Sequence, residues 1–207
     1  MTTATSTITR KAAEARPDSV VTPERFAQGM TGFASWMGAI EKNKESFQRH
    51  YDEFTPDAQD IAALKRLVDE HGVKMLVLGE DWCPDVWRGL PVACKIAEQS
   101  GMESRLFLRD QNKDIMSEFL KQGEFESIPT IVFYDRTHRY LGHWIERADQ
   151  ANEEMGPLRE ILAGVERDTP AWEAARAKYN TKTWELAEGW RQAQVRELIA
   201  LLREALS

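Results

Sequence analysis

The chain has 207 residues, of which 42% are hydrophobic, a length that allows one core of ordinary size with helical additions. Its formal net charge of −7 argues against binding nucleic acid through phosphates and against docking on an anionic membrane surface. No apolar run approaches the roughly 20 residues of a membrane span or the core of a signal peptide. Two cysteines, Cys83 and Cys94, do not make a disulfide scaffold. We therefore expect a soluble, cytoplasmic protein.

The N-terminal part is predicted to contain a tail and a helical arm. Residues 1–20 are rich in Ser and Thr, and we expect a disordered tail; a transit peptide is the alternative, against which Glu14 and Asp18 argue. Residues 21–57 are predicted to be helical from the start signal Thr22–Pro23 onward. Apolar residues recur there at steps of three and four, at Phe26, Met30, Phe33, Trp36, Met37 and Ile40. Such a stripe is typical of packing on a main domain, and an aromatic ligand site is the alternative.

Helices and strands are predicted to alternate through the main domain, residues 58–165. The expected elements are a helix ending at His71, strands at Met75–Leu78 and Arg105–Arg109, helices at Asp85–Gln99 and from Asp110 through Leu120, strands at Pro129–Tyr134 and Tyr140–Trp144, and a helix at Ala151–Leu162. This order is β-α-β-α-β-β-α, a parallel half joined to an antiparallel half. It predicts an α/β fold with a mixed four-stranded sheet.

A helical extension is predicted for residues 166–207. One short helix begins at Thr169–Pro170 and a second near Thr183, which carries an apolar stripe toward the C-terminus. The plain interpretation is a helix that docks on its own domain. The alternative is a contact between two copies of the chain, a homodimer.

The most informative stretch is the turn after the first of these strands. The apolar run Met75–Leu78 predicts a strand buried on both faces, and Pro84 fits the first position of the helix that follows. Cys83 then becomes the residue that caps this helix, with its sulfur near the positive end of the helix dipole. A cysteine in this place is a candidate for a reactive thiol.

The charges near Cys83 leave the direction of its pKa shift open. Helix-terminal N–H groups lower a thiol pKa, whereas Glu80, Asp81 and Asp85 place negative charge nearby, which Arg88 offsets only in part. The acidic residues should disfavour anionic partners such as glutathione and favour neutral or basic peptides.

Three features together resemble the thioredoxin-like superfamily over residues 60–164. They are Trp82–Cys83, which is similar to the family's W-C; Ile128–Thr130, which is similar to its I-P-T; and Pro91, at the place of the proline in its active-site helix. The segment Glu80–Asp85, with the sequence E-D-W-C-P-D, is most similar to a bacterial subgroup with a W-C-[GP]-D site. The resemblance implies the thioredoxin fold, with helical extensions at both ends, and a cis peptide bond before Pro129.

The chain departs from the family at two positions. The family's second, resolving cysteine falls on Val86, and its buried acid falls on Val77. Cys94 cannot replace the resolving cysteine, because eleven helical residues place it roughly 16 Å from Cys83 along the helix. We interpret Cys94 as a buried structural thiol.

The resemblance and these departures predict a monothiol thiol-disulfide oxidoreductase that acts in redox homeostasis. Cys83 is the catalytic residue, and the predicted substrate-binding residues are Trp82, Pro84, Asp85, Ile128 and Pro129. The expected partners of such an oxidoreductase are protein or small-molecule disulfides and an external thiol reductant. An inert cysteine in a non-catalytic module, which binds peptides or proteins at the Trp82 and Pro129 groove, is the alternative. A thiol-dependent peroxidase or transferase is a third class, and the sequence shows no anion subsite for it.

We expect no metal and no cofactor. The four histidines have no metal-ligand spacing with the cysteines, and the sequence has no glycine loop that could hold a phosphate.

Overall fold

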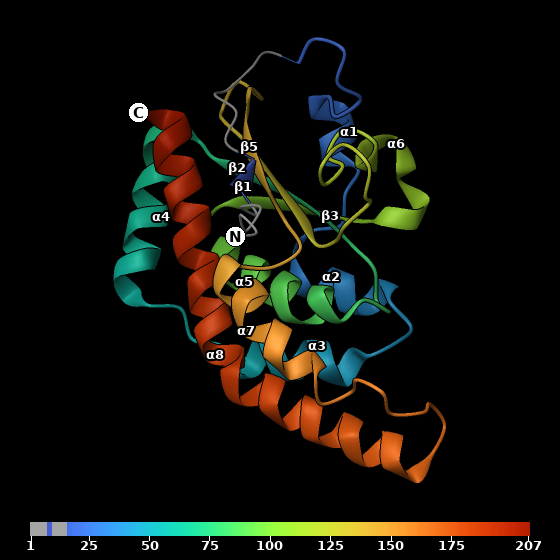
Figure 1. The fold of residues 1–207 in the computed structure, drawn as a ribbon. Helices are drawn as coiled ribbons and strands as arrows, with labels where there is room; N and C mark the ends of the chain where they lie inside the picture. Colours follow the sequence, from blue (N-terminus) through green and yellow to red (C-terminus); the bar gives the residue numbers. More distant parts are fainter. Residues whose placement is uncertain (1–7, 10–15) are drawn as a thin grey trace.

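A mixed sheet forms the centre of the protein (Figure 1), whose computed structural model describes residues 8–9 and 16–207. Within these residues the strand order is β1-β5-β4-β2-β3. The strands are β1 (Ile8–Thr9), β2 (Lys74–Gly79), β3 (Glu103–Leu108), β4 (Thr130–Tyr134) and β5 (Tyr140–Ile145). β2 runs parallel to β3 and antiparallel to β4, which pairs antiparallel with β5. The predicted four-stranded α/β sheet is confirmed, with β1 added at one edge.

β1 is a difference from the sequence prediction, which treated residues 1–20 as a disordered tail. Ile8 pairs with Trp144 and Thr9 with His143 along the outer edge of β5. An edge strand such as β5 has free backbone N–H and C=O groups, which can pair with a segment of any side-chain composition. The polar composition of residues 1–20 therefore did not reveal the pairing. The tail residues 1–7 and 10–15 lie outside the described residues.

β2 lies between β3 and β4, which explains its continuous apolar run. Met75, Leu76, Val77 and Leu78 have no exposed surface. Val77 pairs with Leu106 on one side and with Ile131 on the other. Since both faces of this strand are covered, it needs no alternation of polar and apolar residues.

The helices surround the sheet. They are α1 (Pro23–Ala27), α2 (Gly32–Ala39), α3 (Lys44–Glu53), α4 (Ala58–His71), α5 (Pro84–Ser100), α6 (Lys113–Met116), α7 (Asp149–Arg159) and α8 (Pro170–Leu206). The N-terminal arm is thus three short helices, and its side chains Trp36, Phe47 and Phe54 are fully buried in the core. Packing on the main domain, rather than an aromatic ligand site, accounts for this apolar stripe.

The chain between β3 and β4 contains less helix than predicted. A 3₁₀ turn at Arg109–Gln111 precedes α6, which ends at Met116, and Phe119 and Leu120 follow it. Phe119 nevertheless reaches the core, with 1% of its surface exposed. A buried apolar residue at helical spacing therefore did not require a continuous helix.

The C-terminal extension contains one helix from residue 170 onward and not two. The hydroxyls of Thr181 and Thr183 donate to the carbonyls of Ala177 and Asn180, so these polar residues are satisfied inside the helix. The C-terminal part of α8 packs on α4, α5, α7 and β5, whereas its N-terminal turns, before Thr183, project away from the domain (Figure 1). Docking on its own domain is therefore observed, and the homodimer stays a prediction.

None of the helices within residues 16–207 is long and apolar enough to cross a membrane.

Candidate functional site

Cys83 caps the N-terminus of α5, as predicted. Its backbone is extended, with φ −89° and ψ 121°, and its carbonyl accepts from the N–H groups of Val86 and Trp87 at 3.1 and 3.2 Å. Pro84 is the first residue of the helix and is exposed. The Cys83 side chain is half-buried.

Val86, at the place of a resolving cysteine, is a packing residue. It is fully buried, and a Cβ added at Gly79 would lie 2.7 Å from its Cγ1. The end of β2 and the first turn of α5 therefore approach closely only because residue 79 is glycine. This contact explains why an apolar side chain occupies position 86 in a chain without an internal dithiol.

The structure brings Cys83 next to Ile128 and Pro129. The Cys83 Sγ lies 3.7 Å from the Ile128 carbonyl oxygen, and the Ile128–Pro129 peptide bond is cis. Ile128 is 4% exposed, and Pro129 is buried as well. The Glu146 N–H donates to the Pro129 carbonyl at 2.7 Å, which ties the end of β5 to this turn. Cys83 therefore lies beside Ile128 and Pro129, as predicted. Because Ile128 and Pro129 are buried, the accessible surface of the site is on the side of Cys83.

Gly89 lets α5 approach Pro129. A Cβ at this position would lie 3.0 Å from the Pro129 Cγ and 3.3 Å from the Oε1 atom of Gln194, whose Nε2 donates to the Gly89 carbonyl at 2.9 Å. α8 therefore holds α5 at the level of the site.

Gly89→Val is expected to lower the free energy of unfolding by about 1–3 kcal/mol, because the added carbons overpack this contact. Urea unfolding measures the change. Gly38→Val is the matched control, since nothing lies within 4 Å of a Cβ added at Gly38. An equal loss of stability in both variants would contradict the packing argument.

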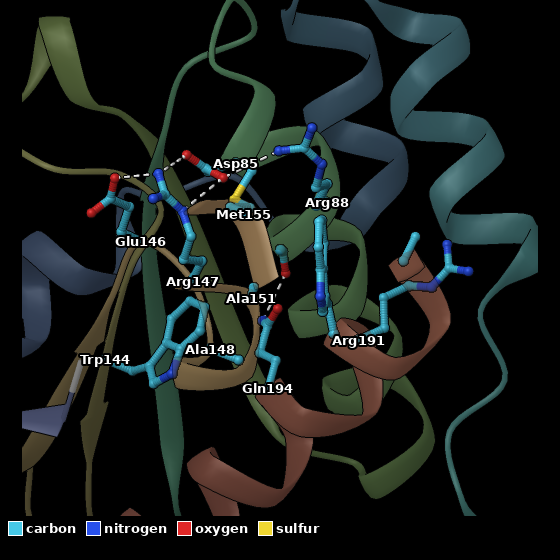
Figure 2. A pocket seen from close by; sticks show the side chains of 13 residues that line it. Asp85, Arg88, Trp144, Glu146, Arg147, Ala148, Ala151, Met155, Arg191 and Gln194 are labelled. Carbon is cyan, nitrogen blue, oxygen red and sulfur yellow. Dashed lines mark hydrogen bonds and ion pairs between the residues drawn. The ribbon is translucent and has the colours of Figure 1, made fainter. Parts of the chain in front are cut away.

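A cluster of charged side chains surrounds the first turn of α5 (Figure 2). Arg147, which follows β5, donates from Nε and Nη2 to the two carboxylate oxygens of Asp85 at 3.1 and 2.5 Å. Arg88 approaches the same carboxylate at 3.3 Å. Glu146 pairs with Arg147 and with Lys121, which links this cluster to the loop before β4. Asp85, predicted as a substrate-binding residue, is thus already held by two arginines.

Burial raises the pKa of the Cys83 thiol above its ordinary value, and the carboxylates of Asp85 and Glu146 raise it further. The backbone N–H groups of Val86 and Asp85 act in the opposite direction. The pKa of Cys83, whose direction of shift the sequence left open, is therefore shifted upward. Arg147 also interacts electrostatically with Cys83, and it limits the effect of Asp85 by pairing with it.

Two of the acidic residues expected near the thiol point elsewhere. The Glu80 carboxylate accepts from the Asp110 N–H at 2.7 Å, and burial raises the pKa of Glu80 above its usual range. The Asp81 carboxylate accepts from the N–H groups of Glu41 and Lys42 at 3.0 and 2.8 Å. Both carboxylates stabilise neighbouring loops, because buried or turn-forming backbone amides need acceptors.

Two large aromatic side chains are exposed: Trp82, which precedes Cys83 in the sequence, and Phe125, which lies in the loop before β4. Trp82 is 46% exposed and Phe125 is 50% exposed, and the Arg109 guanidinium lies 5.2 Å from the centre of the Trp82 ring. Arg109 also donates to the Glu126 carbonyl at 3.0 Å. Trp87 is half-buried, and its indole N–H donates to the Asp81 carbonyl at 2.7 Å. Trp82 is therefore the tryptophan available to a partner.

Sequence reasoning did not identify Arg147 or Arg109 as site residues. No local motif marks them, because each is distant in sequence from Cys83. The strand pairing could have located Arg147. The register pairs Ile145 with Thr130, so the residues that follow β5 lie beside Pro129. A predicted hairpin with a defined register would have placed Arg147 near the thiol.

Cys94 is a structural thiol, as predicted. It is 3% exposed in the interior of α5, and burial raises the pKa of its thiol far above the ordinary value. A thiol in this state is inert toward disulfides. Within the described part of the chain, no group of three or more His, Cys, Asp or Glu side chains could hold a metal ion.

The sheet, the capping cysteine and the cis proline define a thioredoxin-fold protein. Residues 30–163 match a family model described as "Thioredoxin", so the chain belongs to the thioredoxin family. No curated protein matches the chain. The W-C-[GP]-D subgroup stays a prediction.

Two solved structures are similar to the chain. One is a protein of unknown function from Pseudomonas aeruginosa, with 18% identity and a TM-score of 0.61 over 87% of this chain and 95% of the other. The second is an HIV epitope scaffold, with 19% identity and a TM-score of 0.59 over 89% of this chain and 98% of the other. At these identities the likeness concerns the fold alone.

Proposed function

We propose that the protein is a monothiol thiol-disulfide oxidoreductase that acts through Cys83. The observation that carries the proposal is the position of the half-buried Cys83 Sγ at the start of α5, 3.7 Å from the carbonyl oxygen that precedes the cis proline. The exposed Trp82 lies next to it and offers an apolar surface to a disulfide-bearing peptide. The N–H groups of Val86 and Asp85 stabilise the thiolate.

The reaction consists of two exchanges. The Cys83 thiolate attacks one sulfur of a substrate disulfide, a new S–S bond forms, and the other substrate sulfur leaves as a thiolate. With Val86 at the resolving position, the thiolate of an external low-molecular-weight thiol then attacks the substrate sulfur of the mixed disulfide. Cys83 leaves as a thiolate, and the substrate sulfur is now bonded to the external thiol. A reducing, cytoplasmic compartment supplies such thiols.

The raised pKa gives this site a definite kinetic character. At neutral pH a small fraction of Cys83 is ionised, which slows the first exchange, although each thiolate that forms is a stronger nucleophile. A thiol of high pKa is also a slow leaving group. We therefore infer that the mixed disulfide is long-lived.

Mass spectrometry after incubation with glutathione disulfide tests the proposal. The expected product is one glutathione adduct on Cys83, reversed by added dithiothreitol, and none on Cys94. Cys83→Ser is the control and is expected to lose the adduct completely. A native protein that forms no adduct even at pH 9 contradicts the proposal.

A non-catalytic peptide-binding module is the second candidate, and the raised pKa of Cys83 favours it. Trp82, the exposed aromatic residue that precedes Cys83, is the surface that such a module would use. Binding of unstructured peptides that Cys83→Ser leaves intact and Trp82→Ala weakens, together with an unreactive Cys83, supports this candidate over the first.

A further inference from the structure

A groove of about 750 Å³ lies along α5 at a distance from Cys83. α2 and α3, which lie beside α5 (Figure 1), form two of its walls, and residues at the start of β3 form another. Its volume is within the range of small-molecule sites. Glu98, on the α5 wall, lies roughly 22 Å from Cys83 along the helix axis, at about 1.5 Å per residue. The groove is therefore separate from the thiol.

The walls of the groove are largely apolar. Phe33 and Met37 belong to the apolar stripe of the N-terminal arm, but they are only partly buried, whereas Trp36 is fully buried. The rings of Phe33 and Tyr51 stack with their centres 4.2 Å apart and their planes at 6°. Met37 and Met102 also line the groove, and their unbranched side chains adapt to the shape of a ligand. Such walls suit a ligand with an apolar body.

Glu98 is the one charged side chain among the described residues that line the groove. Its carboxylate accepts a hydrogen bond from the Tyr51 hydroxyl, and no lysine, arginine or histidine in the described part of the chain pairs with it. Burial, together with the hydrogen bond and charge of Glu98, raises the pKa of Tyr51 to about 12. The phenol therefore stays protonated at neutral pH and leaves the negative charge on Glu98.

Lys95 is a cation near the same wall, but it does not line the groove. Its ammonium group donates to the carbonyls of Tyr51 and Phe54 at 2.5 and 2.8 Å and lies 4.6 Å from the centre of the Tyr51 ring. Because Phe33 covers one face of that ring, the Lys95 ammonium lies over the other face. A ligand in the groove therefore meets the carboxylate of Glu98 without a cation already paired to it.

We propose that this groove binds a small amphiphilic amine, whose ammonium group pairs with Glu98 and whose apolar body lies against Phe33 and the two methionines. A carboxylate beside an aromatic wall favours an ammonium group, because the ion pair and the cation–π attraction act together. The volume of the groove favours a small molecule over a segment of another protein. This inference goes beyond the proposed function and does not depend on the reactivity of Cys83.

Titration calorimetry with the full chain tests the inference. The probes are 1-naphthylmethylamine and the neutral 1-naphthalenemethanol, which has nearly the same shape. Saturable binding of the amine is expected, about tenfold tighter than that of the alcohol, because only the amine forms a charge-assisted hydrogen bond with Glu98. Glu98→Gln should abolish this preference, although its amide oxygen still accepts from Tyr51. Glu160→Gln, at an exposed position after α7, is the matched control and should retain the preference.

A second variant tests the place of binding. Ala34 is exposed and lines the groove, so Ala34→Leu fills a part of the groove without a change in the core. This variant should weaken the binding of both probes, whereas Ala39→Leu, at an exposed position of α2 outside the groove, should weaken neither.

Three results would overturn the inference. The first is a native protein that binds neither probe or binds the amine and the alcohol equally. The second is a preference for the amine that Glu98→Gln retains, since another group would then hold the ammonium. The third is equal affinity for the amine in the native and Ala34→Leu proteins, because binding would then occur elsewhere.

Discussion

Between pH 7 and pH 5 the free energy of unfolding is expected to fall by about 4 kcal/mol, because two buried histidines must ionise when the chain unfolds. Burial lowers the pKa of His50 to about 3 and that of His143 to about 4. Both side chains are at most 5% exposed, so solvent screens them little. Each histidine contributes about 2 kcal/mol of this change.

The surroundings of both histidines oppose a positive charge. His50 faces Arg191, Arg88 and Arg49 and lies 4.6 Å from the Trp184 ring, between ring centres. His143 forms a hydrogen bond through Nδ1 with the Tyr140 hydroxyl.

The environment of His143 is likewise aromatic and cationic. Its ring lies 5.4 Å from the Phe119 ring, between centres, and Arg16 is the charged group that lowers its pKa in addition to burial. A protonated ring at either histidine would therefore lack a carboxylate partner among the groups that act on its pKa.

The two lowered histidine pKa values determine that stability falls, and does not rise, as the pH is lowered. A histidine whose folded pKa is depressed contributes stability that is fully present above its unfolded pKa of about 6.5. This contribution is lost as the pH falls from 6.5 toward the folded values of about 3 and about 4. Glu80 and Glu197, whose pKa values burial raises, act in the opposite direction and offset a part of the loss.

Urea unfolding at pH 7, 6 and 5 measures the effect. His143→Gln keeps an acceptor for Tyr140 and removes the titration, so this variant should lose about 2 kcal/mol of the pH dependence although it is less stable at pH 7. His71→Gln, at a half-exposed position at the end of α4, is the control and should retain the full dependence. A pH dependence that is the same in all three proteins contradicts the assignment.

The sequence predicted the elements in which local chemistry and tertiary packing agree. The apolar run at Met75–Leu78 is β2, and Pro84 and Cys83 take the first helical and capping positions of α5. The hairpin of β4 and β5 also lies where the alternation and the turn indicated. In β2 and in the hairpin, the residues that favour the local conformation are also those that the core buries, whereas Pro84 and Cys83 follow from the local chemistry of a helix start.

Other features depend on contacts that no short segment encodes. The pairing of β1 depends on the edge of β5, and the short α6 reflects a chain that buries Phe119 without helical geometry. The continuity of α8 through Thr181 and Thr183 depends on hydroxyls that bond within the helix. Arg147 reaches Asp85 across 62 residues of sequence, and only the register of β4 and β5 brings the two together.

The ion pair between Asp85 and Arg147 gives the second large effect, which concerns the reactivity of Cys83. Asp85→Asn is expected to lower the pKa of the thiol and to speed alkylation by iodoacetamide about tenfold at pH 7, because a nearby negative charge is removed. Arg147→Gln is expected to slow alkylation by a similar factor, since Asp85 and Glu146 then act on the thiol with less compensation. Both changes should appear as shifts of the pH at which the rate is half-maximal, with an unchanged limiting rate per thiolate to first order.

The pH profile distinguishes an electrostatic role of Arg147 from a purely structural one. Loss of structure would expose both thiols and speed alkylation at every pH, and mass spectrometry would then find adducts on the buried Cys94 as well as on Cys83. Arg159→Gln, an exposed arginine near the end of α7, controls for a general change of charge. If Asp85→Asn and Arg147→Gln shift the profile in the same direction, the thiol responds to something other than this ion pair. Opposite shifts identify the arginine after β5 as the group that keeps the acidic turn at the start of α5 compatible with a reactive cysteine.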